Sequence, residues 1–379
     1  MKNFPIKIIL LIIFSYIIIL NLIKFNKNNF YKKYEVFIKC KKFINKCVKG
    51  VYVKSNKINK KNKILITSII PVYNTENKIK SSIRSIQNQN LTDIEILLVN
   101  DFSTDKSLKV IEDLKKEDPR ILIINNKKNM GTLYSRSIGV LKSKGEYIFC
   151  LDNDDMFFDN DIFYYGYKIS KLEHYDIVSF RRFHSFKHNF NVKKIKNFYL
   201  KNVSDFVVRQ PDLGKYPISK NNKFLKNDII IWGKSIKKNI YKKAINKSWK
   251  YIYSNFVCYN EDIIMIYVIF NIANSFKFIN KYGVIHIIST SSTCFTQPKD
   301  NKIFAQLLFI DIILEFSNKN INKNFAVDQA IKIYKLYNIS QFNNKNKLYA
   351  KSIIKKIINN KYIIANKKIK ILSIFKIFL

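Results

Sequence analysis

The sequence predicts an α/β protein built around a parallel, doubly wound sheet of the Rossmann-like kind. Three observations support this class: short apolar strands alternate with amphipathic helices over residues 64–151, polar clusters follow two of those strands, and 47% of the 379 residues are hydrophobic. Such alternation is typical of a parallel sheet covered by helices. The hydrophobic content is sufficient for a buried core and excludes global disorder.

The individual elements are predicted from hydrophobic periodicity. Continuous apolar runs indicate strands at 64–70, 94–99, 121–124 and 147–151. Between these runs, apolar residues recur every three or four positions, which predicts helices over 79–86, 108–114 and 133–141. Pro71 ends the first strand, and Pro119 ends the second helix.

The pattern is looser after residue 160. We expect a helix at 161–173, a strand at 176–183, a loop-rich region to about 228, a helix starting near Glu261, and strands at 276–279 and 284–288. Residues 301–379 are rich in Lys and Ile and are helical in pattern.

The N-terminus contains a candidate membrane segment. Residues 8–23 (IILLIIFSYIIILNLI) are uncharged, and lysines flank them on both sides. The stretch is slightly short for a full span, but flanking Lys side chains can reach the interface. We expect a single-pass anchor, with a cleaved signal peptide or a buried helix as the alternatives. The body of the chain would lie either within an endomembrane compartment, such as the ER or Golgi, or on the cytosolic face of the membrane, and the flanking lysines do not decide between them.

The charge of the chain does not indicate a nucleic-acid partner. The formal net charge is +41, but only six of the 68 basic residues are Arg. Lys, Asn, Ile, Phe and Tyr are all abundant while Gly, Pro and Ala are scarce, which indicates a biased base composition in the gene. Recognition of phosphates and bases would favour the bidentate Arg side chain. We therefore expect no nucleic acid among the partners.

An acidic cluster follows the last of the regular strands. Residues 152–155 (DNDD) come directly after the apolar run that ends at Leu151. Ligands of parallel sheets bind beyond the carboxyl ends of the strands, and clustered carboxylates there can hold Mg²⁺ or Mn²⁺ against a diphosphate. A solvated acidic turn is the alternative.

Several segments together resemble the family 2 glycosyltransferases of the GT-A fold. The resemblance covers residues 64–295, and the segments occur in the family's order at 68–74 (SIIPVYN), 98–105 (LVNDFSTD), 129–139 (NMGTLYSRSIG), 145–148 (GEYI), 152–155 (DNDD), 232–234 (WGK) and 261–262 (ED). With the N-terminal stretch and the C-terminal helical pattern, we expect four parts: a membrane anchor at 1–23, a stem or linker at 24–63, a catalytic domain at 64–300, to which the resemblance applies, and a helical C-terminal region at 301–379. Within the catalytic domain the resemblance implies a nucleotide-binding half at 64–155 and an acceptor half at 156–300.

The resemblance also implies roles for residues of the nucleotide-binding half. Tyr73 would stack on the nucleobase, and Asp101 would accept a hydrogen bond from a uracil N–H. Asp154 would be the metal ligand, with Asp152 near the ribose or behind the metal. The other residues that the resemblance assigns to the nucleotide-sugar site are Pro71, Asn74, Asn100, Arg136 and Lys234.

Two of these assignments leave alternatives open. Arg136 would contact a phosphate or pair with a carboxylate, and Lys234 would hold a donor or acceptor oxygen or lie on a solvated edge. In the acceptor half, Asp262 would be the general base that deprotonates the attacking hydroxyl. Glu261, also at the predicted start of a helix, would orient its neighbour or cap that helix.

The chain departs from the family pattern at three positions. Asn100 replaces the usual Asp, Phe102 replaces the usual Gly, and Ser137 replaces the usual Asn. Asn100 keeps hydrogen-bonding capacity without charge, whereas Phe102 adds a side chain where a ligand would approach closely. The side chain of Phe102 therefore predicts an altered geometry of the donor site.

The function that the resemblance implies is transfer of a single hexose-type sugar to an acceptor hydroxyl with inversion. The donor would be a nucleotide-diphosphate sugar, with UDP-sugars favoured, the cofactor Mn²⁺ or Mg²⁺, and the acceptor a glycan, lipid or protein. The alternative is an inactive relative that binds nucleotide sugar or glycan as a scaffold, which the substitutions at Asn100 and Phe102 favour and which intact Asp154 and Asp262 disfavour.

Overall fold

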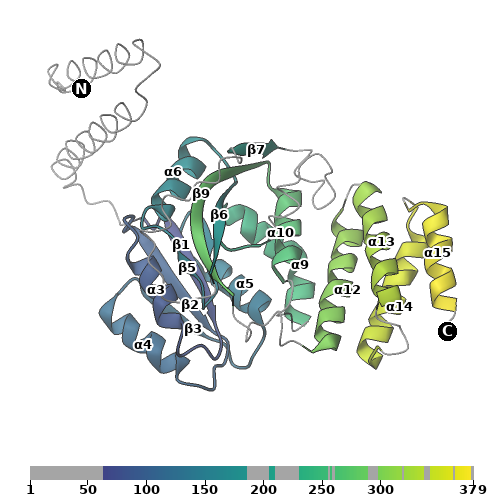
Figure 1. The fold of residues 1–379 in the computed structure, drawn as a ribbon, viewed down its shortest axis with the longest axis horizontal. Helices are drawn as coiled ribbons and strands as arrows, with labels where there is room; N and C mark the ends of the chain where they lie inside the picture. Colours follow the sequence, from purple (N-terminus) through teal and green to yellow (C-terminus); the bar gives the residue numbers. More distant parts are fainter. Residues whose placement is uncertain are drawn as a thin grey trace, which may run out of the picture. The chain divides into compact units, whose positions relative to one another are not determined.

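The chain divides into two units, residues 1–61 and 62–379. A computed structural model describes residues 63–185, 205–209, 230–254, 257, 261–288, 298–317, 320–336, 342–361 and 363–376 (Figure 1). The predicted membrane anchor at 1–23 and nearly all of the predicted stem lie outside these residues. Across the described ranges, every helix is too short or too polar to span a bilayer.

Four parallel strands form the part of the sheet that carries the first motifs. They are β1 (Ile66–Val72), β2 (Ile94–Asn100), β3 (Ile121–Asn125) and β4 (Tyr147–Cys150), in the spatial order β3-β2-β1-β4. β1 and β2 are buried throughout because helices cover both faces of the sheet. All four predicted strands are confirmed, with small shifts at their ends.

The remainder of the sheet is mixed, so the prediction of a parallel sheet holds only for its first half. The added strands are β5 (Met156–Phe157), β6 (Ile177–Ser185), β7 (Phe206–Arg209), β8 (Lys234–Lys237) and β9 (Ser275–Ile287). Strand β8 runs antiparallel to both β4 and β6, while β6 and β9 are parallel. The two strands predicted at 276–279 and 284–288 form one long strand, β9.

The predicted helices of the first half are all present. They are α3 (Ile79–Gln87), α4 (Ser107–Glu117), α5 (Thr132–Lys142) and α6 (Ile162–Leu172). In α3 the buried residues Ile79, Ile83 and Ile86 recur at the spacing of one helix face. Helix α5 approaches β1 closely at Gly139, where an added Cβ would lie 2.6 Å from a methyl carbon of Ile69.

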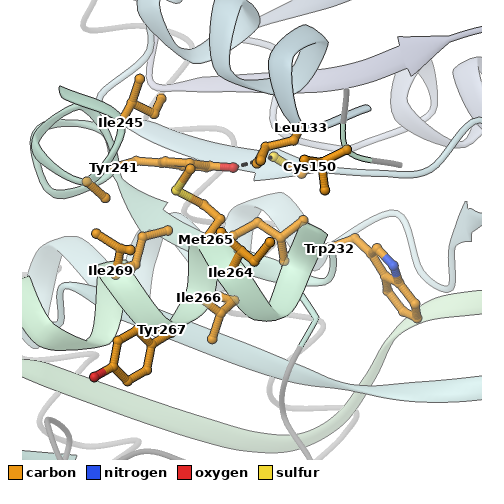
Figure 2. Close-up of a cluster of buried hydrophobic side chains, with 14 of the residues drawn as sticks. Leu133, Cys150, Trp232, Tyr241, Ile245, Ile264, Met265, Ile266, Tyr267 and Ile269 are labelled. Atoms are coloured by element: carbon orange, nitrogen blue, oxygen red, sulfur yellow. Dashed lines mark hydrogen bonds between the residues drawn. The ribbon is translucent and has the colours of Figure 1, made fainter. Parts of the chain in front are cut away.

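Two helices of the second half position the acceptor-side motif. Helix α10 (Glu261–Ile272) is confirmed, but α9 (Lys238–Ser254) was not predicted. The signal for α9 was available, because its buried residues Ile240, Tyr241, Ala244, Ile245, Ser248 and Ile252 follow helical spacing. Figure 2 shows Ile264, Met265 and Ile266 of α10 in the buried cluster with Tyr241 and Ile245 of α9. This packing fixes the first turn of α10.

The C-terminal region is helical, as the sequence predicts. It consists of α12 (Lys299–Phe316), α13 (Asn320–Leu336), α14 (Asn344–Asn359) and α15 (Ala365–Lys376), which follow α9 and α10 in Figure 1. Glu315 of α12 accepts hydrogen bonds from Lys250 (2.7 Å) and Tyr251 of α9. These bonds connect the C-terminal helices to the domain that carries the motifs.

Candidate active site

Sequence-predicted site residues gather at the carboxyl edge of β1, β2 and β4. In the parallel register, Val72 of β1 lies opposite Asn100 of β2, and Ile69 of β1 lies opposite Cys150 of β4. The loops that follow these strands are therefore neighbours. The edge brings together residues 71–74, 100–101 and 152–155, as expected for a parallel sheet.

Asp101 organises the loop that precedes α5. Its carboxylate accepts hydrogen bonds from the Asn126 side chain (2.7 Å) and from the backbone N–H groups of Met130 (2.9 Å) and Gly131 (2.8 Å). Gly131 has φ +88° and an added Cβ would lie 2.9 Å from the Val257 carbonyl oxygen, so only glycine fits there. A carboxylate has about four acceptor positions, so Asp101 retains one for a ligand.

Asn74 and Asn100 hold the two strand ends together. Asn74 accepts from the backbone N–H of Thr104 (2.9 Å). Asn100 donates to the side chain of its cross-strand partner Asn125 (3.0 Å) and accepts from the N–H of Ser103 (3.2 Å). Asn100 thus replaces a carboxylate with an amide that pairs with another amide. Pro71 is buried within β1, so it affects the site only through the course of the backbone into residues 73–74.

The acidic loop is divided between structural and open carboxylates. Asp155 is fully buried, and its oxygens pair with Nδ1 of His286 (3.1 Å) and accept from the N–H of Ile287 (2.9 Å). His286 in turn stacks on Trp232, with ring centroids 5.0 Å apart. Burial raises the pKa of Asp155 to about 7, against the opposing effect of His286. This contact attaches the acidic loop to β9 and to the segment at 232–234.

Asp154 is more open than Asp155, with 23% of its side chain exposed against none of the Asp155 side chain. It lies 3.6 Å from Nζ of Lys78, the residue before α3. Burial and the neighbouring charge of Asp152 raise the pKa of Asp154, and Lys78 opposes them. A carboxylate in this environment gains from an additional cation close by.

The first acidic residue of the loop is joined to the acceptor-side motif by Arg136. The side chain of Arg136 on α5 is only 2% exposed. It donates to Asp152 (2.7 Å) and Asp262 (2.8 Å), and lies 3.6 Å from Glu261. Of the two roles expected for Arg136, the structure therefore shows pairing with carboxylates.

Three carboxylates around one guanidinium are an unbalanced set of buried charges. Burial raises the pKa of Asp262 to about 8 and also raises the pKa of Glu261, although Arg136 favours the charged form of both. If all three carboxylates were ionised, the cluster would carry two uncompensated negative charges away from water. Burial is the main cause of the high pKa of Asp262, and repulsion from Glu261 and Asp152 adds to it, because protonation of one carboxyl relieves both costs.

The comparisons with known proteins agree with this arrangement. The sequence profile of "Glycosyl transferase family 2" matches residues 67–247. These residues form a family 2 glycosyltransferase domain. The match includes the ends of β1, β2 and β4, Arg136 and the segment at 232–234, and it stops before Glu261 and Asp262.

The alignments with relatives cover only a short part of each chain. An uncharacterised glycosyltransferase of Haemophilus influenzae is 41% identical over 97 residues, which is 26% of this chain and 38% of that protein. A GalNAc(5)-diNAcBac-PP-undecaprenol beta-1,3-glucosyltransferase of Campylobacter jejuni is 33% identical over 91 residues, or 24% and 29% of the two chains. The chain thus matches well under half the length of these relatives.

Solved structures resemble the chain over a much larger share. Crystal structures of residues 1–349 of S. aureus TarS in complex with UDP and with UDP-GlcNAc give TM-scores of 0.53 and 0.55 at 14% identity. The latter match covers 78% of this chain and 80% of that one. At this identity the likeness concerns the fold, which is a mixed α/β sheet of the GT-A kind.

The carboxylates of the family 2 domain fit a divalent metal ion whose coordination is completed by the phosphates of a bound nucleotide. The described part of the chain contains no group of three or more His, Cys, Asp and Glu side chains that could bind an ion alone. Mg²⁺-type ions usually take one or two carboxylates and complete their coordination with substrate phosphates and water. Asp154, with Asp152 two residues before it, meets that requirement.

Sequence reasoning placed Lys234 correctly in the domain and overlooked His286. Lys234 lies in β8 with its side chain 1% exposed, which excludes the solvated-edge alternative. His286 lies within a predicted strand that carries no motif, yet it contacts Asp155 across 131 positions of sequence. No local signal marks such a contact, because it depends on the position of β9 beside the acidic loop.

We predict that Asp262→Asn stabilises the fold while it alters the site. A carboxyl whose pKa is raised on folding loses stability as the pH rises from its unfolded pKa, about 4, to its folded pKa, about 8. Near pH 5 the variant should therefore unfold at about the same temperature as the unmutated chain. At pH 8 its free energy of unfolding should be higher by roughly 1–2 kcal/mol, after the weaker hydrogen bond of the amide to Arg136 is subtracted.

Thermal unfolding followed by circular dichroism between pH 5 and pH 8 measures this difference. Asp113→Asn, an exposed carboxylate paired with Lys116 on α4, is the control and should show no such gain. A gain from Asp262→Asn that did not depend on pH would contradict the raised pKa.

Proposed function

We propose that the chain is an inverting glycosyltransferase that transfers one hexose-type sugar from a nucleotide-diphosphate donor to an acceptor hydroxyl. One observation carries this proposal: a single guanidinium, Arg136, bonds both Asp152 of the acidic loop and Asp262 at the start of α10. The loop that would receive the diphosphate is therefore one side chain away from the candidate base. A direct displacement needs this proximity.

Asp262 has the properties of a general base for the acceptor. Its carboxylate is held by Arg136 and by the backbone N–H of Ile231, and its raised pKa of about 8 makes it a better proton acceptor than a solvated carboxylate. In the proposed reaction Asp262 takes the proton of the hydroxyl as that oxygen bonds to the anomeric carbon. The bond to the leaving diphosphate breaks on the opposite face, so the anomeric configuration inverts. Glu261 adjusts the charge around Arg136 and orients its neighbour.

The donor site is proposed at the ends of β1 and β2, with uridine as the favoured nucleoside. Asp101 keeps one acceptor position beside an exposed Tyr73, which supports recognition of a base N–H by a hydrogen bond and of the base plane by stacking. The crystal structures of TarS with UDP and UDP-GlcNAc, on a similar fold, support the same choice. Asn74 and Asn100 would maintain the loops of this site.

Mn²⁺ or Mg²⁺ is the proposed cofactor, held by Asp154 together with the donor, with Asp152 near the ribose or behind the metal. When bound, it would compensate the negative charge that develops on the departing diphosphate. The raised pKa of Asp154 supports this role, because a carboxylate that is costly to ionise alone gains most from a cation. Lys78, 3.6 Å from Asp154, supplies a second positive charge at this end of the site.

The acceptor is proposed to be a glycan, lipid or protein hydroxyl that approaches from the side of α10. The alternative function is that of an inactive relative that binds nucleotide sugar or glycan as a scaffold, and it was based on Asn100 and Phe102. The amide pair of Asn100 with Asn125 weakens that basis, because it preserves the strand end without the usual carboxylate. Turnover separates the two functions.

We further propose that residues 1–23 anchor the chain to a membrane, on the basis of the uncharged stretch at 8–23. The full chain should remain in the membrane fraction after alkaline carbonate extraction, and a variant that begins at residue 24 should appear in the supernatant. Extraction of the full chain by carbonate would overturn the anchor and leave the transferase proposal intact.

Metal-dependent donor binding is predicted to require Asp154. Asp154→Asn replaces a charged oxygen ligand with a neutral one, so UDP should bind at least tenfold more weakly in the presence of Mn²⁺. Isothermal titration of UDP with and without Mn²⁺ measures the effect, with Asp159→Asn, which pairs with Lys281, as the control. Equal UDP affinity with and without Mn²⁺ in the unmutated chain would show that the metal has no role.

Turnover is predicted to depend on Asp262 far more than donor binding does. Asp262→Asn keeps the shape of the side chain and removes the proton acceptor, so the rate of transfer should fall by roughly two or more orders of magnitude. Glu261→Gln should be milder. Product formation from a panel of nucleotide sugars, with the anomeric configuration read by NMR, gives both measurements. Retention of configuration, or a variant at 262 that keeps most of its rate, would disprove the single displacement.

A further inference from the structure

An exposed aromatic residue with a strained backbone lies beside the proposed donor site. Phe102 has φ +63°, in the left-handed region that residues with a Cβ rarely adopt, and 51% of the residue is exposed. Neither the backbone conformation nor the exposure of the ring favours folding. Strain of this kind at a loop edge calls for a functional explanation.

Hydrogen bonds place Phe102 next to Tyr73. The N–H of Asp101 donates to the carbonyl of Val72 (2.8 Å), and Phe102 and Tyr73 are the residues that follow these two. On the far side of the pair, the N–H of Asn74 donates to Ser103 Oγ (3.3 Å). The two aromatic residues are thus held on adjacent loops, and Tyr73 is also exposed, at 44%.

The arrangement provides two aromatic residues around one polar group. Asp101, which precedes Phe102, is buried and has one acceptor position left for an N–H donor. A planar ligand that carries an N–H at its edge and presents two flat faces fits these three residues. A nucleobase has that shape and chemistry.

We propose that Phe102 is a nucleobase-binding residue that stacks on the base of the nucleoside diphosphate together with Tyr73. This inference rests on the proposed donor site and assigns to it a contact beyond those of Tyr73 and Asp101. The strained backbone of Phe102 leaves an aromatic residue exposed directly after the carboxyl end of β2. Stability is lost at this position in exchange for affinity.

The test uses opposite effects on stability and binding. Phe102→Gly removes the left-handed strain, so the melting temperature should rise by roughly 2–4 °C. The same change removes one base–aromatic stack, so UDP affinity measured by isothermal titration with Mn²⁺ should fall roughly 5- to 150-fold. Affinity for inorganic diphosphate should not change, because that probe has no base.

Three further variants separate stacking from loop conformation. Phe102→Asn tolerates the left-handed conformation without a ring and should lose affinity as Phe102→Gly does. Phe102→Trp keeps a flat ring and should bind UDP about as well as the unmutated chain. Tyr164→Ala is the control, because Tyr164 is also exposed, at 44% against 51% for Phe102, but lies on α6, where the N–H of Phe163 donates to Gln89 just after α3.

Each outcome has a definite consequence. The comparison uses whichever of UDP, GDP and CDP the unmutated chain binds best. If Phe102→Gly binds that nucleotide as tightly as the unmutated chain does, the role of Phe102 is overturned while the donor site stands. A fall in stability on Phe102→Gly would also overturn it, because the ring would then serve the fold. If the unmutated chain binds none of the three nucleotides, the donor site itself is overturned, and this inference with it.

Discussion

The buried guanidinium of Arg136 is the interaction on which the rest of the site depends. It joins α5, the acidic loop after β4 and the first turn of α10, which are far apart in sequence. Removing the Arg136 side chain would leave its three carboxylate partners without a counter-charge, and an uncompensated buried charge typically costs about 3–5 kcal/mol. The position of the candidate base relative to the diphosphate site is therefore set by a contact that is expensive to break.

The same contact explains the electrostatics of the site. Burial raises the pKa of Asp262, and the charges of Glu261 and Asp152, which one cation cannot neutralise, raise it further despite the 2.8 Å hydrogen bond to Arg136. Such a carboxyl is a poor contributor to stability and a good proton acceptor. The activity proposed for the chain and the instability of its charge cluster have one physical origin.

A second compromise between stability and function occurs at the ends of β1 and β2. Asn100 is accommodated by Asn125 on the neighbouring strand, so the loss of the usual carboxylate leaves the strand end intact. Phe102 is not accommodated in this way, since its backbone keeps a conformation suited to glycine and its ring remains exposed. The two departures from the family pattern thus have different structural consequences.

By itself the sequence determined the alternating elements of residues 64–151 and the motif residues at the sheet edge, because hydrophobic periodicity and strand ends are local properties of a chain. It did not determine the antiparallel position of β8, the single strand β9, or the partners of Arg136, Asp155 and Lys234. The contact between Arg136 and Asp262 spans 126 positions, and that between Asp155 and His286 spans 131. Only the tertiary structure decides such contacts, because the choice among carboxylates depends on how the elements pack and on which charges are removed from water.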